Sequence, residues 1–293
     1  MSSIWSRARE RGHAVIRMAF NFFSNRPLND DGGVAVVTTD LRKHKRFRSK
    51  FLAEARDIIV YVPSGYDDDL DRKYPVLYLH DGQNLFDPKT AYIPGQDWKA
   101  DDTSEELIAQ GAIEPTIIVG IYNTGEHRTE EYTPTSDPNH GGGNADLYGR
   151  MLVEEIKPFI DGKYRTLTDA SNTGLGGSSL GGLVSLYLGL VYPDVFGKLA
   201  VISPSVWWDN KRILDLVKES VPKPRLCVWL DIGTEEGVEA VSGARELRDA
   251  LLSAGWQQGC DLMYEEIKGG VHSESAWAER LGDVLKYLFP PVT

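Results

Sequence analysis

Short apolar runs alternate with longer amphipathic segments over most of the chain. The run at 75–80 (PVLYLH) is continuously apolar, as in a strand that is covered on both faces. Runs of this kind predict strands at 34–39, 57–62, 75–80, 116–121, 172–176, 198–203, 225–232 and 261–267. Helical periodicity between them predicts helices at 103–110, 144–160, 180–192, 211–218, 238–254 and 274–289. The alternation favours an α/β fold with a mostly parallel eight-stranded sheet and helices on both faces.

Two polar features refine this picture locally. Thr103 followed by Glu106 has the pattern of a capping box, so we expect the first helix to begin there. The segment 41–50 is rich in Lys and Arg. We expect it to form a solvated loop or a hairpin edge, because lysines on an edge block unwanted strand pairing.

The chain has no internal repeat, low-complexity tract or linker, which favours a single α/β domain over residues 31–293. Residues 1–30 are expected to form an N-terminal helical extension, because six apolar residues would line one helix face: Ile4, Trp5, Ala8, Val15, Ala19 and Phe22. This segment lacks the continuous apolar core of a secretory signal, so we expect a cytoplasmic protein. No apolar run reaches transmembrane length, so no integral membrane association is expected.

The formal net charge of the 293-residue chain is −11. Such an acidic balance disfavours nucleic-acid phosphates and anionic membrane surfaces as partners. We expect a small-molecule substrate, and the sequence leaves open whether the chain forms a homo-oligomer. The two cysteines, Cys227 and Cys260, are expected to be buried free thiols.

One motif carries recognisable chemistry. Residues 177–181 read Gly-Ser-Ser-Leu-Gly, a G-x-S-x-G pattern between a predicted strand and a predicted helix. A strand, a sharp turn and a helix are the context of a nucleophile elbow, in which the central serine is held in a strained conformation. We therefore expect Ser179 to be a nucleophile at the start of the helix, where backbone amides favour developing negative charge.

A serine nucleophile needs a base and a group that orients the base. In chains with an elbow, the acid and then the histidine follow the serine. Of the six histidines only His272 follows Ser179, so it is the expected base. The acid should follow the strand at 225–232, where Glu236 is preferred because it lies far enough into the loop to reach His272. Asp231 and Glu235 remain alternatives.

The tetrahedral intermediate needs two hydrogen-bond donors for its oxyanion. We expect the amide of Leu180, directly after the nucleophile, and the amide of Gln83, in the loop after the third strand. His80, at the end of that strand, is expected to be a structural neighbour. The chain has no H-E-x-x-H motif, no cysteine pair at zinc spacing and no phosphate-loop motif, so neither a metal nor a cofactor is expected.

Four further residues are candidates for substrate binding because they follow strands or lie in long loops at the same sheet edge: Trp207, Trp208, Arg128 and Trp98. Aromatic walls suit a flat or apolar acyl group, although core packing would explain Trp207 and Trp208 equally well. Arg128 would meet a substrate carboxylate or pair with Glu130 or Glu131.

Several motifs together resemble a known family: 80–87 (HDGQNLFD), 128–134 (RTEEYTP), 176–197, 203–209 (SPSVWWD), 230–237 (LDIGTEEG) and 269–277 (GGVHSESAW). Over about residues 45 to 290 the chain resembles the esterase D family of α/β-hydrolases. That family includes enterochelin esterases, feruloyl and acetyl-xylan esterases, and S-formylglutathione hydrolases.

The resemblance implies an α/β-hydrolase fold and cofactor-free hydrolysis of a carboxylic ester through an acyl-enzyme. It implies Ser179 as nucleophile, His272 as base and Glu236 as acid, although many members carry Asp where this chain has Glu. An acetyl, feruloyl or siderophore-type ester is the expected substrate. The alternatives are an acyltransferase that uses the same acyl-enzyme and a non-catalytic ligand-binding protein on a hydrolase scaffold.

Overall fold

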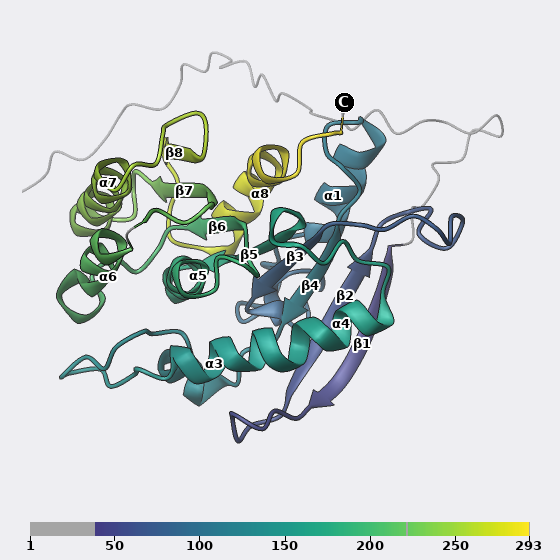
Figure 1. Ribbon diagram of the computed structural model, residues 1–293, viewed down its shortest axis with the longest axis horizontal. Helices are drawn as coiled ribbons and strands as arrows, with labels where there is room; N and C mark the ends of the chain where they lie inside the picture. Colours follow the sequence, from purple (N-terminus) through teal and green to yellow (C-terminus); the bar gives the residue numbers. More distant parts are fainter. Residues whose placement is uncertain (1–38, 221, 293) are drawn as a thin grey trace, which may run out of the picture. The chain divides into compact units, whose positions relative to one another are not determined.

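The computed structural model describes residues 39–220 and 222–292, which form one α/β unit (Figure 1). The expected helical extension at 1–30 lies outside the described residues, as does all of the expected strand at 34–39 except Thr39. Within the described part, eight strands form one sheet in the order β1-β2-β4-β3-β5-β6-β7-β8. The predicted fold class, a mostly parallel eight-stranded sheet with helices on both faces, is confirmed.

The sheet is parallel from β4 to β8 and antiparallel at one side, where β2 pairs with β1 and β4. Its strands are β1 Asp40–Phe47, β2 Arg56–Val62, β3 Val76–His80, β4 Ile117–Ile121, β5 Thr173–Ser178, β6 Lys198–Ile202, β7 Cys227–Gly233 and β8 Leu262–Ile267. The central strands β3, β4 and β5 are buried along their whole length, as the continuous apolar run at 75–80 predicted for β3. Because β5 to β8 are parallel neighbours, their carboxyl ends share one edge of the sheet.

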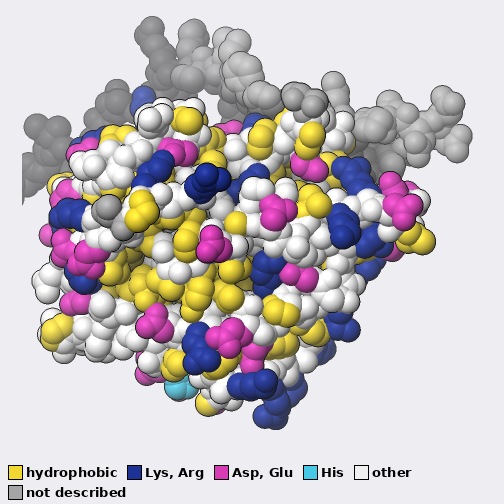
Figure 2. Space-filling model, viewed as in Figure 1, with side chains coloured by type: hydrophobic (Ala, Val, Ile, Leu, Met, Phe, Trp, Pro, Cys, Tyr) yellow, Lys and Arg dark blue, Asp and Glu magenta, His cyan; other side chains and the backbone are white. Residues whose placement is uncertain are grey.

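The basic segment after Thr39 forms the edge strand β1. Figure 2 shows Lys and Arg side chains gathered along the edge of the molecule where β1 lies. Charged side chains at such an edge oppose pairing with the strand of another molecule. The two cysteines are both free, but Cys227 is half-buried and Cys260 is exposed, so the prediction that they are buried was wrong for Cys260.

The helices cover both faces of the sheet (Figure 1). They are α1 Ala100–Ala109, α2 Arg128–Glu131, α3 Ala145–Met151, α4 Lys157–Lys163, α5 Leu180–Val191, α6 Trp208–Glu219, α7 Val238–Ser253 and α8 Glu274–Leu288, with a π-helical turn at Leu152–Ile156 joining α3 to α4. Alternate residues of β2 enter different cores: Ile58 and Val60 pack on the side of α3 to α7, and Ile59 packs on the side of α1 and α8. This alternation places a separate apolar core on each face of the sheet. No helix in the described ranges has the length and apolar character that a bilayer crossing requires.

Two helix starts differ from their predictions. α1 begins at Ala100 and not at Thr103, because Thr103 already donates its amide to the carbonyl of Lys99 at 2.9 Å. The predicted cap at Thr103 was therefore wrong. α6 begins at Trp208, but Asp209 and the next two residues have left-handed backbone angles, so its regular part begins after Lys211, one residue later than the predicted 211–218.

The loop after β3 packs directly on the neighbouring strand β4. Gly82 lies against the backbone of Gly120, and a Cβ atom at residue 82 would come within 2.5 Å of the carbonyl carbon of Gly120. Because the obstacle is backbone, a larger side chain can be admitted only if the loop moves away from β4.

Gly82→Ala is therefore expected to lower the free energy of unfolding by about 1–3 kcal/mol, as overpacking does elsewhere. The measurement is urea unfolding followed by circular dichroism. The matched control is Gly162→Ala, where the added Cβ meets nothing within 4 Å, so stability should be unchanged or raised by up to about 1 kcal/mol. Equal stability of the two variants would contradict the close contact.

Candidate active site

Ser179 occupies a sharp turn between β5 and α5. It has φ 60° and ψ −122°, a backbone conformation that is strained for a residue with a side chain. Its amide donates to the carbonyl of Ile202 (3.0 Å), and its carbonyl accepts from the amide of Ser205 (3.0 Å), so two bonds to the neighbouring chain segment hold the turn. A Cβ at Gly182 would lie 2.9 Å from the carbonyl oxygen of Ile202, which explains why that position needs glycine.

The Ser179 hydroxyl shares a hydrogen bond with the hydroxyl of Ser205 at 3.3 Å. Within the described residues it makes no hydrogen bond with His272. The structure thus places Ser179 at the carboxyl end of β5, as predicted, and adds Ser205 as a neighbour that the motif did not indicate. The signal was present as the Ser-Pro-Ser run that follows β6.

His272 lies in the loop between β8 and α8 and contacts Glu236, which follows β7. Its Nδ1 donates to Oε2 of Glu236 at 2.7 Å. The Glu236 side chain is fully buried, whereas the His272 side chain is 45% exposed. The ring of Trp277 packs edge-on against the imidazole with centroids 4.8 Å apart. The imidazole is therefore held from two directions while part of it faces outward.

The electrostatics of Glu236 favour its charged form. Burial on its own would raise the pKa of Glu236, but hydrogen bonds from His272, Ser203 and the amide of Gly233 outweigh it and lower the pKa. Hydrogen bonds to the charged form of a carboxyl have this effect in general. Glu236 is thus ionised at neutral pH and suited to stabilise a neighbouring imidazolium.

The other two candidate acids do not contact His272. Asp231 lies inside β7 with its side chain fully buried, and it accepts hydrogen bonds from Arg280 (2.9 Å) and from the indole of Trp229 (2.8 Å). Burial raises the pKa of Asp231 in spite of these bonds. Glu235 is exposed. Of the three acids, the structure brings only Glu236 to the imidazole.

The two expected oxyanion donors lie in separate loops at this sheet edge. Gln83 lies two residues after Asp81, which has a left-handed backbone conformation with φ 56°. Among residues 39–220 and 222–292 the amides of Gln83 and Leu180 find no acceptor, so both are available to bind an anionic oxygen. Next to this loop, burial lowers the pKa of His80 to about 3, so His80 stays neutral and does not serve as a base near neutral pH.

Arg128 holds the loop that contains Gln83. Its Nε and Nη2 donate to the two carboxylate oxygens of Asp81 at 2.8 and 2.7 Å. Burial would raise the pKa of Asp81, but the Arg128 charge and hydrogen bonds from Arg128 and Asn123 lower it. The predicted pairing of Arg128 with Glu130 or Glu131 was wrong, because Asp81 occupies its guanidinium and Glu131 pairs with Arg56.

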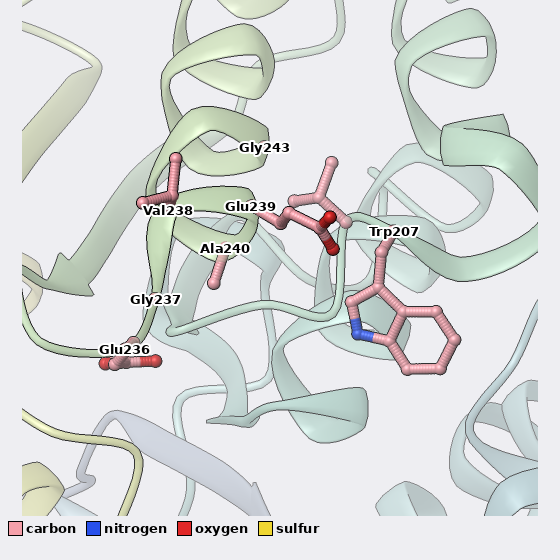
Figure 3. Close-up of a pocket in the computed structure, with 8 residues that line it drawn as sticks. Trp207, Glu236, Gly237, Val238, Glu239, Ala240 and Gly243 are labelled. Atoms are coloured by element: carbon pink, nitrogen blue, oxygen red, sulfur yellow. The ribbon is translucent and has the colours of Figure 1, made fainter.

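The aromatic candidates divide by exposure. Trp207 is 49% exposed and lines a cavity of about 410 Å³, together with Val206, Glu236, Gly237, Val238, Glu239, Ala240 and Gly243. Figure 3 shows its indole across this cavity from the first turn of α7. Trp208 is buried, and its indole donates to the carbonyl of Thr135 (2.8 Å). Trp98 is buried against Trp277 with ring centroids 6.2 Å apart. The structure therefore places only Trp207 where a ligand can reach it, and Trp98 and Trp208 belong to the core.

Sequence reasoning missed two residues behind the site, Arg280 and Ser203. Ser203 Oγ donates to Oε1 of Glu236 at 2.6 Å, and Arg280 Nη2 donates to the same oxygen at 3.2 Å. Arg280 is the one cation among the mostly apolar buried residues of α8 and lies beside Trp277 and Leu281. A charged residue at a core position was the available signal. No set of three or more metal-ligating side chains occurs in the described part of the chain.

The chain is similar to known esterases in sequence. The family model described as "Putative esterase" matches residues 49–288. The uncharacterized protein YjcH of Bacillus subtilis (strain 168) is 33% identical over 195 residues, which are 66% of this chain and 73% of that protein. The iron(III) salmochelin esterase of Escherichia coli O6:H1 is 26% identical over 78% of this chain and 53% of its own length.

A solved structure agrees with these matches. The crystal structure of the BES protein from Bacillus cereus has a TM-score of 0.67 at 25% identity and covers 88% of this chain and 97% of that chain. The family match spans strands β2 to β8 and all of α8, and leaves out only β1 of the sheet. The chain therefore belongs to the esterase family, has the α/β-hydrolase fold, and is a carboxylic-ester hydrolase.

Proposed function

We propose that the protein hydrolyses its ester through an acyl-enzyme on Ser179, with His272 as general base and Glu236 as the acid that orients it. The observation that carries the proposal is the 2.7 Å bond from His272 Nδ1 to Glu236 Oε2. That bond fixes the tautomer with its proton on Nδ1 and leaves Nε2 able to accept a proton. The strained turn at Ser179 supports the same assignment.

Attack begins when the Ser179 hydroxyl exchanges its bond with Ser205 for one with Nε2 of His272. Catalytic hydrogen bonds are often long or absent before substrate binds, so this rearrangement is an ordinary one. The hydroxyl oxygen bonds to the ester carbonyl carbon, and its proton passes to Nε2. The carbonyl oxygen becomes an oxyanion that accepts from the amides of Leu180 and Gln83.

The intermediate then collapses to the acyl-enzyme. The bond from the carbonyl carbon to the alcohol oxygen breaks, and the imidazolium returns its proton to that oxygen. Water attacks the acyl-enzyme by the same route, with His272 taking one water proton and delivering it to Ser179. The products are a carboxylic acid and an alcohol, and the three side chains return to their starting protonation states. Glu236 remains charged throughout and stabilises the imidazolium.

We propose that the acyl group is flat or apolar and lies against Trp207. The exposed indole and the apolar residues Val206 and Val238 support this, because such walls bind aromatic and aliphatic groups. A feruloyl or siderophore-type ester would fill the cavity, and the relative named for salmochelin supports the second of these. An acetyl ester would leave the cavity empty.

Glu236→Gln should lower kcat by about 10³- to 10⁴-fold, because the amide cannot stabilise the imidazolium as the carboxylate does. The assay is hydrolysis of 4-nitrophenyl acetate by the purified protein. Glu235→Gln, the same change at the exposed neighbouring residue, is the matched control and should keep full activity. A Glu236→Gln enzyme as active as the control would refute the assignment.

Trp207→Ala should raise KM for a feruloyl ester by about 5- to 20-fold while leaving KM for an acetyl ester within about twofold, because only the larger acyl group loses a wall. Steady-state kinetics on the two substrates give both values. Tyr92→Ala removes another exposed aromatic ring, 80% exposed in a loop, and should change neither constant. An equal KM increase for both esters would contradict acyl-group binding at Trp207.

A further inference from the structure

A buried guanidinium lies between two buried carboxylates directly behind the proposed site. Arg280, on α8, has a side chain that is only 2% exposed, and those of Asp231 and Glu236 are fully buried. Its Nη1 donates to Oδ1 of Asp231 (2.9 Å), and its Nη2 donates to Oε1 of Glu236 (3.2 Å). Buried charges persist in a fold only when they are paired in this way.

Ser203 joins the same cluster and its bonding pattern is determined. Its Oγ accepts from the indole of Trp277 (3.0 Å) and from Nη1 of Arg280 (2.9 Å). Trp277 and Arg280 are donors only, so the single hydroxyl proton of Ser203 must be the one that points to Oε1 of Glu236 at 2.6 Å. Trp277 and Arg280 thus orient the Ser203 hydroxyl so that it donates to Glu236.

These contacts divide the two oxygens of Glu236 between separate tasks. Oε1 accepts from Ser203, from Arg280 and from the amide of Gly233 (2.8 Å), whereas Oε2 accepts from Nδ1 of His272. A carboxylate with one oxygen held by three donors cannot rotate without breaking all of them. The direction of Oε2 is therefore fixed by contacts that do not involve His272.

Asp231 supports this arrangement from the other side of Arg280. Its Oδ2 accepts from the indole of Trp229 (2.8 Å), and its Oδ1 accepts from Arg280. The aspartate thus anchors the guanidinium to β7, and Nη2 also reaches the carbonyl of Val271, next to the base, at 3.4 Å. One cation is tied to the strand, to the acid and to the loop that carries the histidine.

We propose that Arg280 is a positioning residue for catalysis: anchored by Asp231 and assisted by Ser203, it aims the free oxygen of Glu236 at His272. The inference rests on the proposed function, because it needs Glu236 to be the catalytic acid. It assigns to Asp231 the role of an anchor for Arg280 and not that of an acid acting on the imidazole. Arg280 itself touches neither substrate nor reacting atoms.

The test compares Arg280→Lys, Ser203→Ala and Arg212→Lys. Lysine keeps the charge but is unable to reach Asp231 and Glu236 with two directed donors at once. We expect Arg280→Lys to lower kcat by about 10- to 100-fold with KM within about threefold, the size of losing a hydrogen bond to a charged group. Arg212→Lys makes the same change at a partly exposed position on α6, away from the proposed site, and should be fully active.

Rates are normalised to the fraction of protein that remains folded, measured by circular dichroism. A purely structural role would lower the melting temperature of Arg280→Lys while the folded enzyme kept its kcat, and that result would overturn the proposal. If Arg280→Lys does not fold, Ser203→Ala decides. This variant leaves the bonds from Arg280 to Asp231 and to Glu236 in place, removes one donor to Oε1, and takes away the oxygen that accepts from Trp277 and from Nη1 of Arg280. We expect about a 10-fold loss of kcat in the folded protein, and an unchanged kcat would overturn the proposal.

Glu236→Gln is measured in the same assay, to distinguish failure of the positioning role of Arg280 from failure of the catalytic role of Glu236. If Glu236→Gln is impaired and both Arg280→Lys and Ser203→Ala keep their kcat, the positioning role fails and the proposed function stands. If Glu236→Gln is fully active, the proposed function fails and the positioning role fails with it. A lower kcat in Glu236→Gln and also in folded Arg280→Lys supports both the proposed function and the positioning role.

Discussion

The hydrogen bond from the imidazole of His272 to the carboxylate of Glu236 is the interaction on which the proposed site depends. A carboxylate that is fully removed from water is costly unless donors surround it. Here the surrounding donors also give it a direction, because they hold one oxygen and leave the other for the histidine. The requirement for a buried, oriented acid thus explains why a cation and a second carboxylate lie in the core behind it.

The fold makes this meeting of distant residues a consequence of topology. β5, β6, β7 and β8 are parallel neighbours, so the segments that follow them emerge at one edge of the sheet. The elbow serine follows β5, the acid follows β7 and the histidine follows β8. Ser203, which follows β6, donates a hydrogen bond to the proposed acid. Each strand in this half of the sheet is therefore followed by one residue of the proposed site, and the proposed order of serine, acid and histidine is the one that accompanies a nucleophile elbow.

The sequence predicted most of the sheet because buried parallel strands are continuously apolar: the run expected at 116–121 is β4 at Ile117–Ile121. It also predicted Ser179 at the end of β5 and the proximity of Glu236 to His272. It failed where a residue's environment depends on distant parts of the chain. Trp98 lies in a long predicted loop, and its burial against Trp277 is visible only in the folded structure. The proposed role of Arg280 likewise depends on contacts with a strand and a loop that are distant in the sequence.

Whether Ser179 is a nucleophile activated by His272 can be measured by chemical labelling. The protein is treated with an alkyl fluorophosphonate, which phosphonylates an activated serine, and the modified peptide is identified by mass spectrometry. We expect a single phosphonyl group on Ser179 and a labelling rate that falls by about 10³-fold or more in His272→Ala, because that variant lacks the base. Labelling at Ser205, or labelling of Ser179 at an unchanged rate in His272→Ala, would contradict it.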